Sequence, residues 1–211
     1  MEKKKVEPII SPMNKVEKKY RNNLIEAFSQ IVKTGDFILS SGLKSNFYID
    51  LKEILLTPYI MKYVSVCVMK EFMSILITNK SISFYDGYYT SLAGITIGAD
   101  PIVCSTVSDF NVNGLFIRKK EKEYGTKKLI EGKYEEGGNI IIVDDVLTTG
   151  ESIQYSYDVL IDHKLIPIGV IVLVDRQEND AKNKLEQSLG IPVKSVTTKK
   201  EILDGYIQND W

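Results

Sequence analysis

Histidine, cysteine and arginine are all scarce in this chain of 211 residues. The single histidine is His163, the cysteines are Cys67 and Cys104, and the arginines are Arg21, Arg118 and Arg176. One histidine with no paired motif around it argues strongly against Ser/His/Asp and Cys/His hydrolase chemistry. Because His163 stands beside the expected end of a helix, we predict a helix-terminal role for it.

The few cysteines and arginines carry separate information. Both cysteines lie in apolar stretches without metal-ligand spacing, so we expect buried thiols and neither a disulfide nor a zinc site. Arginine supplies only three of the 27 cationic residues. Since lysine is the usual cation of this chain, we expect Arg118 and Arg176 to mark positions that need a planar, bidentate donor. The alternative is that the arginines are placed at random.

Long apolar runs are missing as well. None approaches the length of a membrane span, and the first five residues lack the apolar stretch of a signal peptide, so we expect a cytoplasmic protein without membrane contact. The net charge of -1 gives no global electrostatic reason to expect nucleic-acid binding. With 44% hydrophobic and 26% charged residues, the chain has the composition of a globular protein, and its length suits one α/β domain.

Hydrophobic periodicity and turn residues predict the order of the elements. The N-terminal half is expected to contain a helix at 13–33 that Thr34-Gly35-Asp36 ends, hairpin strands at 37–39 and 47–49, a helix at 59–77, a strand at 92–95, a helix from Pro101 and a strand at 114–117. The C-terminal half is expected to contain strands at 140–143, 169–174 and 193–196, helices at 151–162 and 181–189, and a closing helix. Two all-apolar strands joined through a helix indicate a parallel sheet covered on both faces. Residues 118–138 are highly charged and rich in glycine, which is typical of a solvated loop.

The strongest motif is the segment from Ile141 to Ser152. A buried strand delivers Asp144 and Asp145 to its carboxyl end, and a hydroxyl-rich loop with Gly150 then opens a helix. The two carboxylates can accept hydrogen bonds from ribose hydroxyls, and the loop can bind a phosphate at the helix N-terminus. The alternative is a capped strand-helix turn without a ligand. No Walker lysine motif and no G-x-G-x-x-G occur, which disfavours P-loop and dinucleotide sites.

Residues 143–150 (VDDVLTTG) resemble the binding signature of type I phosphoribosyltransferases for phosphoribosyl pyrophosphate (PRPP). The resemblance implies a parallel sheet flanked by helices, with a small N-terminal hood that contains a helix and a hairpin. It implies one domain over 1–211, with the hood at about 1–58, the α/β core at about 59–211 and a lid loop at 118–138. It also implies PRPP contacts along the whole signature loop: Asp144, Asp145, Val146, Leu147, Thr148, Thr149, Gly150, Glu151 and Ser152.

Three further segments narrow the resemblance to the orotate phosphoribosyltransferase family. Residues 35–50 are similar to that family's hairpin, which implies contacts near the reacting centre from Lys44 and orotate contacts from Lys44, Phe47 and Tyr48. Taken alone, Lys44 would be an exposed turn lysine. Residues 174–178 (VDRQE) resemble the segment whose arginine meets orotate, so Arg176 and Thr148 are expected to bind the base. The alternative for Arg176 is a surface salt bridge to Asp175 or Glu178.

The third segment, residues 116–126, resembles the family's mobile catalytic lid. The expected PRPP contacts there are Arg118, Lys119, Lys122 and Tyr124, and the alternative is a solvated charge run. Many members carry histidine where Tyr124 stands, and eukaryotic-type members commonly carry tyrosine. The loop from Gly94 to Pro101 falls where the family binds pyrophosphate, but bacterial relatives often have lysine at the position of Gly98.

These resemblances predict transfer of ribose 5-phosphate from PRPP to orotate in pyrimidine biosynthesis. The expected catalytic set is Lys44, Arg118, Lys122, Asp144 and Asp145, with Mg²⁺ held mainly by PRPP. A homodimer with a lid shared between subunits is expected, as is possible association with a separate orotidylate decarboxylase, for which this chain has no room. The alternatives are a phosphoribosyltransferase for another base, such as a purine, and a PRPP-sensing regulator without catalysis.

Overall fold

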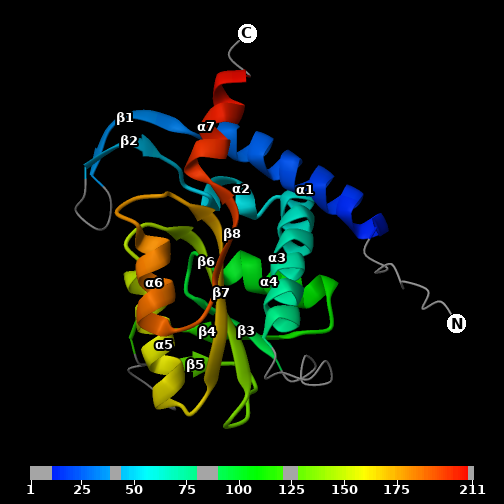
Figure 1. The fold of residues 1–211 in the computed structure, drawn as a ribbon, viewed down its shortest axis with the longest axis vertical. Helices are drawn as coiled ribbons and strands as arrows, with labels where there is room; N and C mark the ends of the chain where they lie inside the picture. Colours follow the sequence, from blue (N-terminus) through cyan, green and yellow to red (C-terminus); the bar gives the residue numbers. More distant parts are fainter. Residues whose placement is uncertain (1–10, 39–43, 80–89, 121–127, 209–211) are drawn as a thin grey trace, which may run out of the picture.

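A computed structural model of the chain describes residues 11–38, 44–79, 90–120 and 128–208 (Figure 1). Its centre is a sheet in the order β5-β4-β3-β6-β7-β8, in which all neighbours are parallel except β4 and β5. The strands are β3 (Ser91–Ile95), β4 (Asn113–Ile117), β5 (Ile130–Glu131), β6 (Asn139–Leu147), β7 (Ile166–Asp175) and β8 (Val193–Thr198). The parallel sheet predicted from the apolar strands is confirmed.

Helices cover both faces of this sheet (Figure 1). One face carries α3 (Pro58–Thr78) and α4 (Asp100–Asp109), and the other carries α5 (Glu151–Asp162) and α6 (Ala181–Leu189). The long α1 (Ser11–Gln30) packs beside α7 (Lys199–Gln208) at one end of the molecule. Across the described ranges, no helix is long and apolar enough to cross a membrane.

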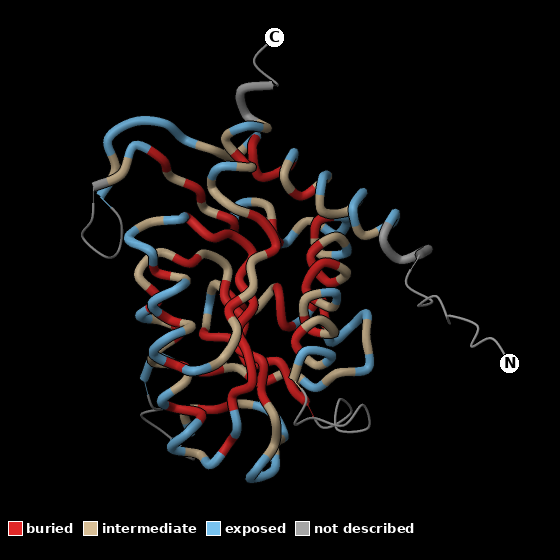
Figure 2. Tube along the Cα trace, in the orientation of Figure 1, coloured by how far each residue is buried: buried red, intermediate tan, exposed pale blue. Residues whose placement is uncertain are grey.

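The sheet separates two hydrophobic cores, and the buried residues follow its strands (Figure 2). Successive strand side chains point to opposite faces, so Ile141 and Val143 of β6 join the core under α3 while Ile140 and Ile142 join the core under α5. β6 and β7 are therefore apolar on both faces. This buried frame fixes where each strand ends, and hence where the loops begin.

The predicted hairpin is formed by β1 (Lys33–Ile38) and β2 (Lys44–Tyr48), which pair antiparallel. The prediction that residues 34–36 only end the first helix is wrong, because they belong to β1, while α1 already ends at Gln30. Phe37 stacks on Tyr48 at 5.3 Å between ring centroids, which helps to hold the two strands together. A short helix that was not predicted, α2 (Lys52–Leu55), follows the hairpin.

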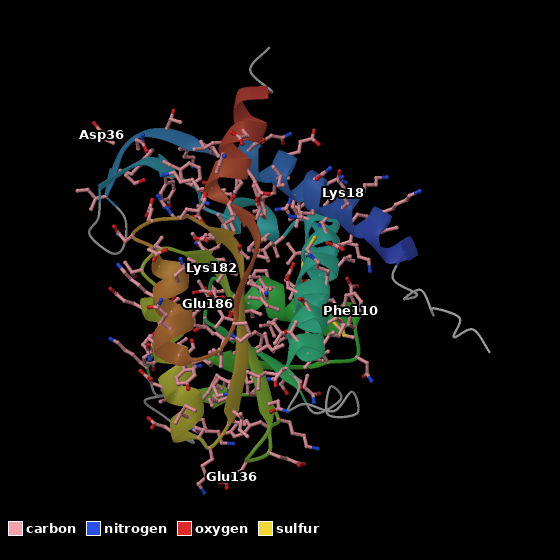
Figure 3. The ribbon with its side chains drawn as sticks, in the orientation of Figure 1. Lys18, Asp36, Phe110, Glu136, Lys182 and Glu186 are labelled. Atoms are coloured by element: carbon pink, nitrogen blue, oxygen red, sulfur yellow. The ribbon has the colours of Figure 1, made fainter. Side chains whose placement is uncertain are left out.

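The prediction that 118–138 is a loop is wrong for part of its described residues, because the segment contains a short strand. Ile130 is only 1% exposed and packs in the core under α5, so residues 130–131 form β5 against β4. One buried isoleucine within a charged run was enough to add a short edge strand. Figure 3 shows Glu136, from the following turn, at the end of the molecule opposite Asp36 of the hairpin.

The predictions for the sulfur and imidazole side chains had mixed outcomes. Both thiols are free; Cys67 is buried, and burial raises its pKa to about 12, whereas Cys104 is exposed. The prediction of a buried thiol is therefore wrong for Cys104, because this residue lies on the side of α4 that faces away from the core. His163 caps α5 as predicted, with Nδ1 2.7 Å from the carbonyl oxygen of Val159.

Candidate active site

A hollow of about 800 Å³ lies at the carboxyl ends of the parallel strands, which is a usual size for a small-molecule site. Loops that follow β3, β6 and β7 meet there, as expected where parallel strands end at one edge. The segment from Tyr48 to Lys52, which leads out of the hairpin, forms another part of the wall. The polar described residues of the wall are Tyr48, Asp50, Lys52, Thr96, Lys119, Asp144, Asp145, Thr148, Thr149, Glu151, Ser152, Tyr155 and Arg176.

Asp144 and Asp145 belong to β6 itself, because the strand continues to Leu147 and does not end at Val143 as predicted. Asp144 is 5% exposed, and its Oδ1 accepts a hydrogen bond from the amide of Asp145 at 2.9 Å. Burial, followed by the charge of Asp145, raises the pKa of Asp144 to about 7. An isolated carboxylate in this position is costly, so the wall is suited to a ligand that brings hydrogen-bond donors or a cation.

The loop from Thr148 to Ser152 turns sharply from β6 into α5. Gly150 has φ of 86° and is the N-cap of α5, and a Cβ there would lie 2.5 Å from Cδ1 of Leu185. Only glycine meets both conditions without strain. No side chain caps α5 at Gly150, and Thr148 and Thr149 line the hollow beside the start of this helix. Such an arrangement can bind an anion such as phosphate.

The loop after β3 lies against the second aspartate. A Cβ on Gly98 would stand 2.8 Å from Oδ2 of Asp145, so the glycine allows the loop backbone and the carboxylate to approach closely. The peptide bond between Thr96 and Ile97 is cis, and the amide of Thr96 donates to the carbonyl of Ile117 at 2.9 Å. A larger side chain at position 98 would have to displace Asp145.

Arg176 follows β7 and is 3% exposed. Its Nη2 donates to the carbonyl oxygen of Phe47 at 2.7 Å, to Ser45 Oγ at 2.8 Å and to Glu178 Oε1 at 3.0 Å. The guanidinium also lies 5.2 Å from the centroid of the Phe47 ring. A salt bridge to Glu178 is present, as in the alternative considered from the sequence, but it is buried and holds the hairpin against the sheet.

The lid residues are only partly described. Arg118 follows β4, with Nη1 3.6 Å from Glu131 Oε1, and its carbonyl oxygen accepts a hydrogen bond from the Tyr155 hydroxyl at 3.0 Å. Among the described residues, Lys119 lines the hollow and Arg118 does not. Lys122 and Tyr124 lie outside the described residues, and so does the side chain of Lys44.

The remaining predicted residues divide between the wall and its support. Tyr48, Val146 and Glu151 line the hollow, whereas Phe47 and Leu147 are buried behind it, and the Leu147 carbonyl accepts from the Arg176 amide at 3.1 Å. Three polar wall residues were not predicted from the sequence: Asp50, Lys52 and Tyr155. The signals available were the position of the first two directly after the hairpin and the position of Tyr155 one turn after Ser152 on α5.

Comparison with known proteins agrees with this geometry. Residues 77–198 match the model of the phosphoribosyl transferase domain family. The chain is 36% identical over 155 residues to the orotate phosphoribosyltransferase of Pyrococcus abyssi, covering 74% of this chain and 80% of the relative. It is 33% identical over 175 residues to that of Caenorhabditis elegans, covering 83% and 72% respectively. The crystal structure of orotate phosphoribosyltransferase from Aeropyrum pernix superposes with a TM-score of 0.68 at 28% identity and covers 93% of this chain and 99% of that chain. On sequence, fold and site together, the chain belongs to the orotate phosphoribosyltransferases, within the phosphoribosyl transferase family.

Proposed function

We propose that this chain transfers ribose 5-phosphate from PRPP to the ring nitrogen of orotate, with release of pyrophosphate. The proposal depends on one observation: the two aspartates with their loop and the arginine of the predicted base site lie side by side at the ends of neighbouring strands. The carboxylates and phosphate-binding loop follow β6, and Arg176 follows β7, where Leu147 pairs with Asp175. One hollow thus presents groups for a sugar phosphate beside a guanidinium suited to a carboxylated base.

PRPP would lie with its ribose against β6. Asp144 and Asp145 would accept hydrogen bonds from the ribose hydroxyls, and the amides of residues 146–152 with the hydroxyls of Thr148 and Thr149 would surround the 5-phosphate. Ser152 Oγ already donates to Asp144 Oδ2 at 2.6 Å, and a hydroxyl has one hydrogen to donate. The backbone amide of Ser152 would therefore donate a hydrogen bond to the 5-phosphate. Its hydroxyl would orient Asp144 toward the ribose hydroxyls.

Orotate would bind between the hairpin and the end of β7. Nη2 and Nε of Arg176 are engaged by Ser45, Phe47 and Glu178, so the orotate carboxylate would take the guanidinium donors on Nη1. Tyr48, Thr148 and Lys44 would complete the base site, and Phe47 would support it from behind. The fixed guanidinium makes the base site ready before orotate arrives.

In the reaction, the bond from the anomeric carbon to the pyrophosphate oxygen breaks and a bond to orotate nitrogen forms. Orotate gives its ring proton to solvent, so no dedicated strong base is needed. Positive charge develops on the ribose and negative charge on the leaving group, and protein groups act mainly by position and charge. We propose that Arg118, Lys119, Lys122, Tyr124 and Lys44 stabilise pyrophosphate when the lid closes over it.

Magnesium fits this wall. Asp144 and Asp145 present hard oxygen atoms, and burial together with the charge of Asp145 raises the pKa of Asp144, an effect that a bound cation would offset. Within the part of the chain that the structure describes, no three His, Cys, Asp or Glu side chains gather as a metal-binding group. We propose that Mg²⁺ is held mainly by diphosphate and ribose oxygens, where it would neutralise charge on the leaving group.

The organisation of the protein is proposed on the same basis. We infer one domain over 1–211 with a hood up to about residue 58, a homodimer that shares its lids, and a cytoplasmic location. A separate orotidylate decarboxylase would consume the product, and co-purification tests whether it is a bound partner. Light scattering after size-exclusion chromatography tests the dimer, and a monomeric mass would contradict it.

A panel of bases tests the substrate. The purified protein is incubated with PRPP, magnesium and either orotate, uracil, adenine or hypoxanthine, and nucleotides are separated by chromatography. The proposal expects orotidine 5′-monophosphate and no purine nucleotide. Product from a purine would assign another base. PRPP binding by calorimetry without any product from the panel would favour a PRPP-sensing regulator.

A further inference from the structure

Lys52 is a cation on the wall of the hollow that the sequence motifs did not include. It begins α2, directly after the hairpin, and its side chain is 49% exposed. Its Nζ lies 2.7 Å from Asp50 Oδ1, and the same oxygen accepts a hydrogen bond from the Lys52 amide at 3.1 Å. Asp50 therefore fixes both the backbone and the ammonium of Lys52 at the edge of the hollow.

The charges around Lys52 keep it protonated. Burial lowers the pKa of the ammonium, but the hydrogen bond to Asp50 and the charge of Asp145 together raise it above its ordinary value. Lys52 and Asp145 both line the hollow, and the charge of Asp145 is one of the causes that raise the pKa of Lys52. Asp145 is the second aspartate of β6, the one that lies against the loop after β3.

Asp144 and Asp145 point to opposite sides of β6 and so mark two parts of the hollow. Neighbouring strand residues point to opposite faces, so Asp144 accepts from Ser152 at the start of α5 while Asp145 lies against Gly98. The 5-phosphate group belongs on the side of Ser152 because the amides of α5 are there. Lys52 lies on the other side, with Asp145 and Gly98, which is where the diphosphate at the anomeric carbon would extend.

Among the described residues, this side of the hollow carries few cations. Gly98 contributes no side chain, and a cation there would meet the Asp145 carboxylate. The described cations of the wall are Lys52, Lys119 and Arg176, and the last is already engaged by Glu178. The wall also carries the acids Asp50, Asp144, Asp145 and Glu151. Before the lid cations and Mg²⁺ contribute, a cation on the wall itself would offset the repulsion between these acids and a diphosphate.

We infer that Lys52 binds the diphosphate of PRPP and the released pyrophosphate, and that Asp50 acts as its positioning residue. The inference rests on the proposed function, because it names a further contact for the same substrate. A lysine on the hairpin side thereby supplies the charge that the loop at Gly98 does not.

The test compares Lys52→Ala and Lys52→Arg with a matched control, Lys33→Ala. Lys33 is 52% exposed and pairs with Glu53 at 2.6 Å, but it does not line the hollow. For each variant, KM is measured for PRPP and orotate, and inhibition constants for pyrophosphate and orotidine 5′-monophosphate. Lys52→Ala should raise the PRPP KM and the pyrophosphate constant on the order of tenfold, the effect of losing a charge-assisted hydrogen bond.

The constants for orotate and orotidine 5′-monophosphate show whether Lys52 acts on the diphosphate alone. Lys52→Ala should leave the orotate KM and the orotidine 5′-monophosphate constant within about twofold, Lys52→Arg should recover most of the pyrophosphate affinity, and Lys33→Ala should match the wild type. An unchanged pyrophosphate constant in active Lys52→Ala would overturn the inference while leaving the proposed function intact. Equal losses for both inhibitors would also overturn it, because they indicate a general structural effect. If the wild type formed no product, the proposed function would fail, and calorimetry with magnesium pyrophosphate would still test Lys52.

Discussion

The hydroxyl of Ser152 donates a hydrogen bond to Asp144 Oδ2 across 2.6 Å, which joins the carboxylate wall of β6 to the first turn of α5. This hydrogen bond fixes the position of the carboxylate relative to the start of the helix, although the two residues are eight positions apart. The hydrogen bond favours the charged form of Asp144, but burial and the charge of Asp145 outweigh it and leave the pKa near 7. Asp144 is thus held in a state that is unfavourable without a ligand.

Asp144→Asn should stabilise the protein at pH 8 while it removes activity. The pKa of Asp144 is raised from 3.8 in the unfolded chain to about 7 in the fold, so the folded state binds this proton more tightly. The contribution of Asp144 to stability is therefore present at low pH and is lost as pH rises from about 4 through about 7. Asparagine removes that pH-dependent loss.

Denaturant unfolding at pH 5 and pH 8 measures this effect. The gain of Asp144→Asn over the wild type should be larger at pH 8, on the order of 1–2 kcal/mol in the free energy of unfolding. The control is Asp204→Asn, at an exposed position on α7, which should show no such pH dependence. A variant that is less stable than the wild type at pH 8 would show that the buried charge of Asp144 does not destabilise the fold.

Gly150→Ala should damage both folding and phosphate binding. The new methyl group would meet Leu185 at 2.5 Å in a residue whose φ is 86°. We expect a loss of about 2–3 kcal/mol in the free energy of unfolding and a higher KM for PRPP. Gly190→Ala is the matched control, because φ is 67° there and no atom lies within 4 Å of the added Cβ. Equal losses in the two variants would mean that the contact with Leu185 has no effect.

Arg176→Lys should raise the KM for orotate at least tenfold and leave the KM for PRPP nearly unchanged. A lysine cannot reproduce the planar contacts to Phe47, Ser45 and Glu178 and at the same time keep the Nη1 donors directed at the orotate carboxylate. Steady-state kinetics with each substrate varied in turn measures the difference. A larger effect on PRPP than on orotate would remove Arg176 from the base site.

Arg21→Lys provides the control for Arg176. Arg21 also binds a carbonyl oxygen, that of Val196 at 2.8 Å, and a glutamate, Glu201 at 2.6 Å, but it lies away from the hollow. Both variants should unfold at lower denaturant concentration than the wild type. Each should lose about 1–2 kcal/mol in the free energy of unfolding. Only Arg176→Lys should change orotate kinetics.

Lys122→Ala should lower turnover far more than it weakens PRPP affinity. The reason is that charge on the leaving pyrophosphate grows as the bond breaks, so a lid cation acts mainly on the transition state. Single-turnover rates and calorimetric PRPP binding separate the two quantities. A normal rate in the folded variant would remove Lys122 from the mechanism.

Much of the fold was predictable because its signals are local. The all-apolar residues of β6 and β7 identified buried parallel strands, and helix α5 begins and ends at the predicted residues, 151 and 162. The short strand β5 was missed because its two residues are too few to show any periodicity, and its pairing with β4 depends on the core under α5. Likewise, an apolar neighbourhood in the sequence did not tell which face of α4 would carry Cys104.

The site was predictable to a similar extent. The aspartates and the phosphate loop stand in one contiguous segment, so their proximity needed no knowledge of the fold. Lys52 and Tyr155 were missed because their place in the wall depends on how the hairpin and α5 pack over the sheet. The burial of Arg176 under Phe47 joins residues 129 positions apart, which no local pattern reveals.

The most direct measurement of the central claim follows the absorbance of orotate in the presence of the purified protein, PRPP and magnesium. We expect a steady loss of orotate absorbance that requires all three and yields orotidine 5′-monophosphate and pyrophosphate. Folded protein that binds PRPP but leaves the orotate absorbance unchanged would contradict it.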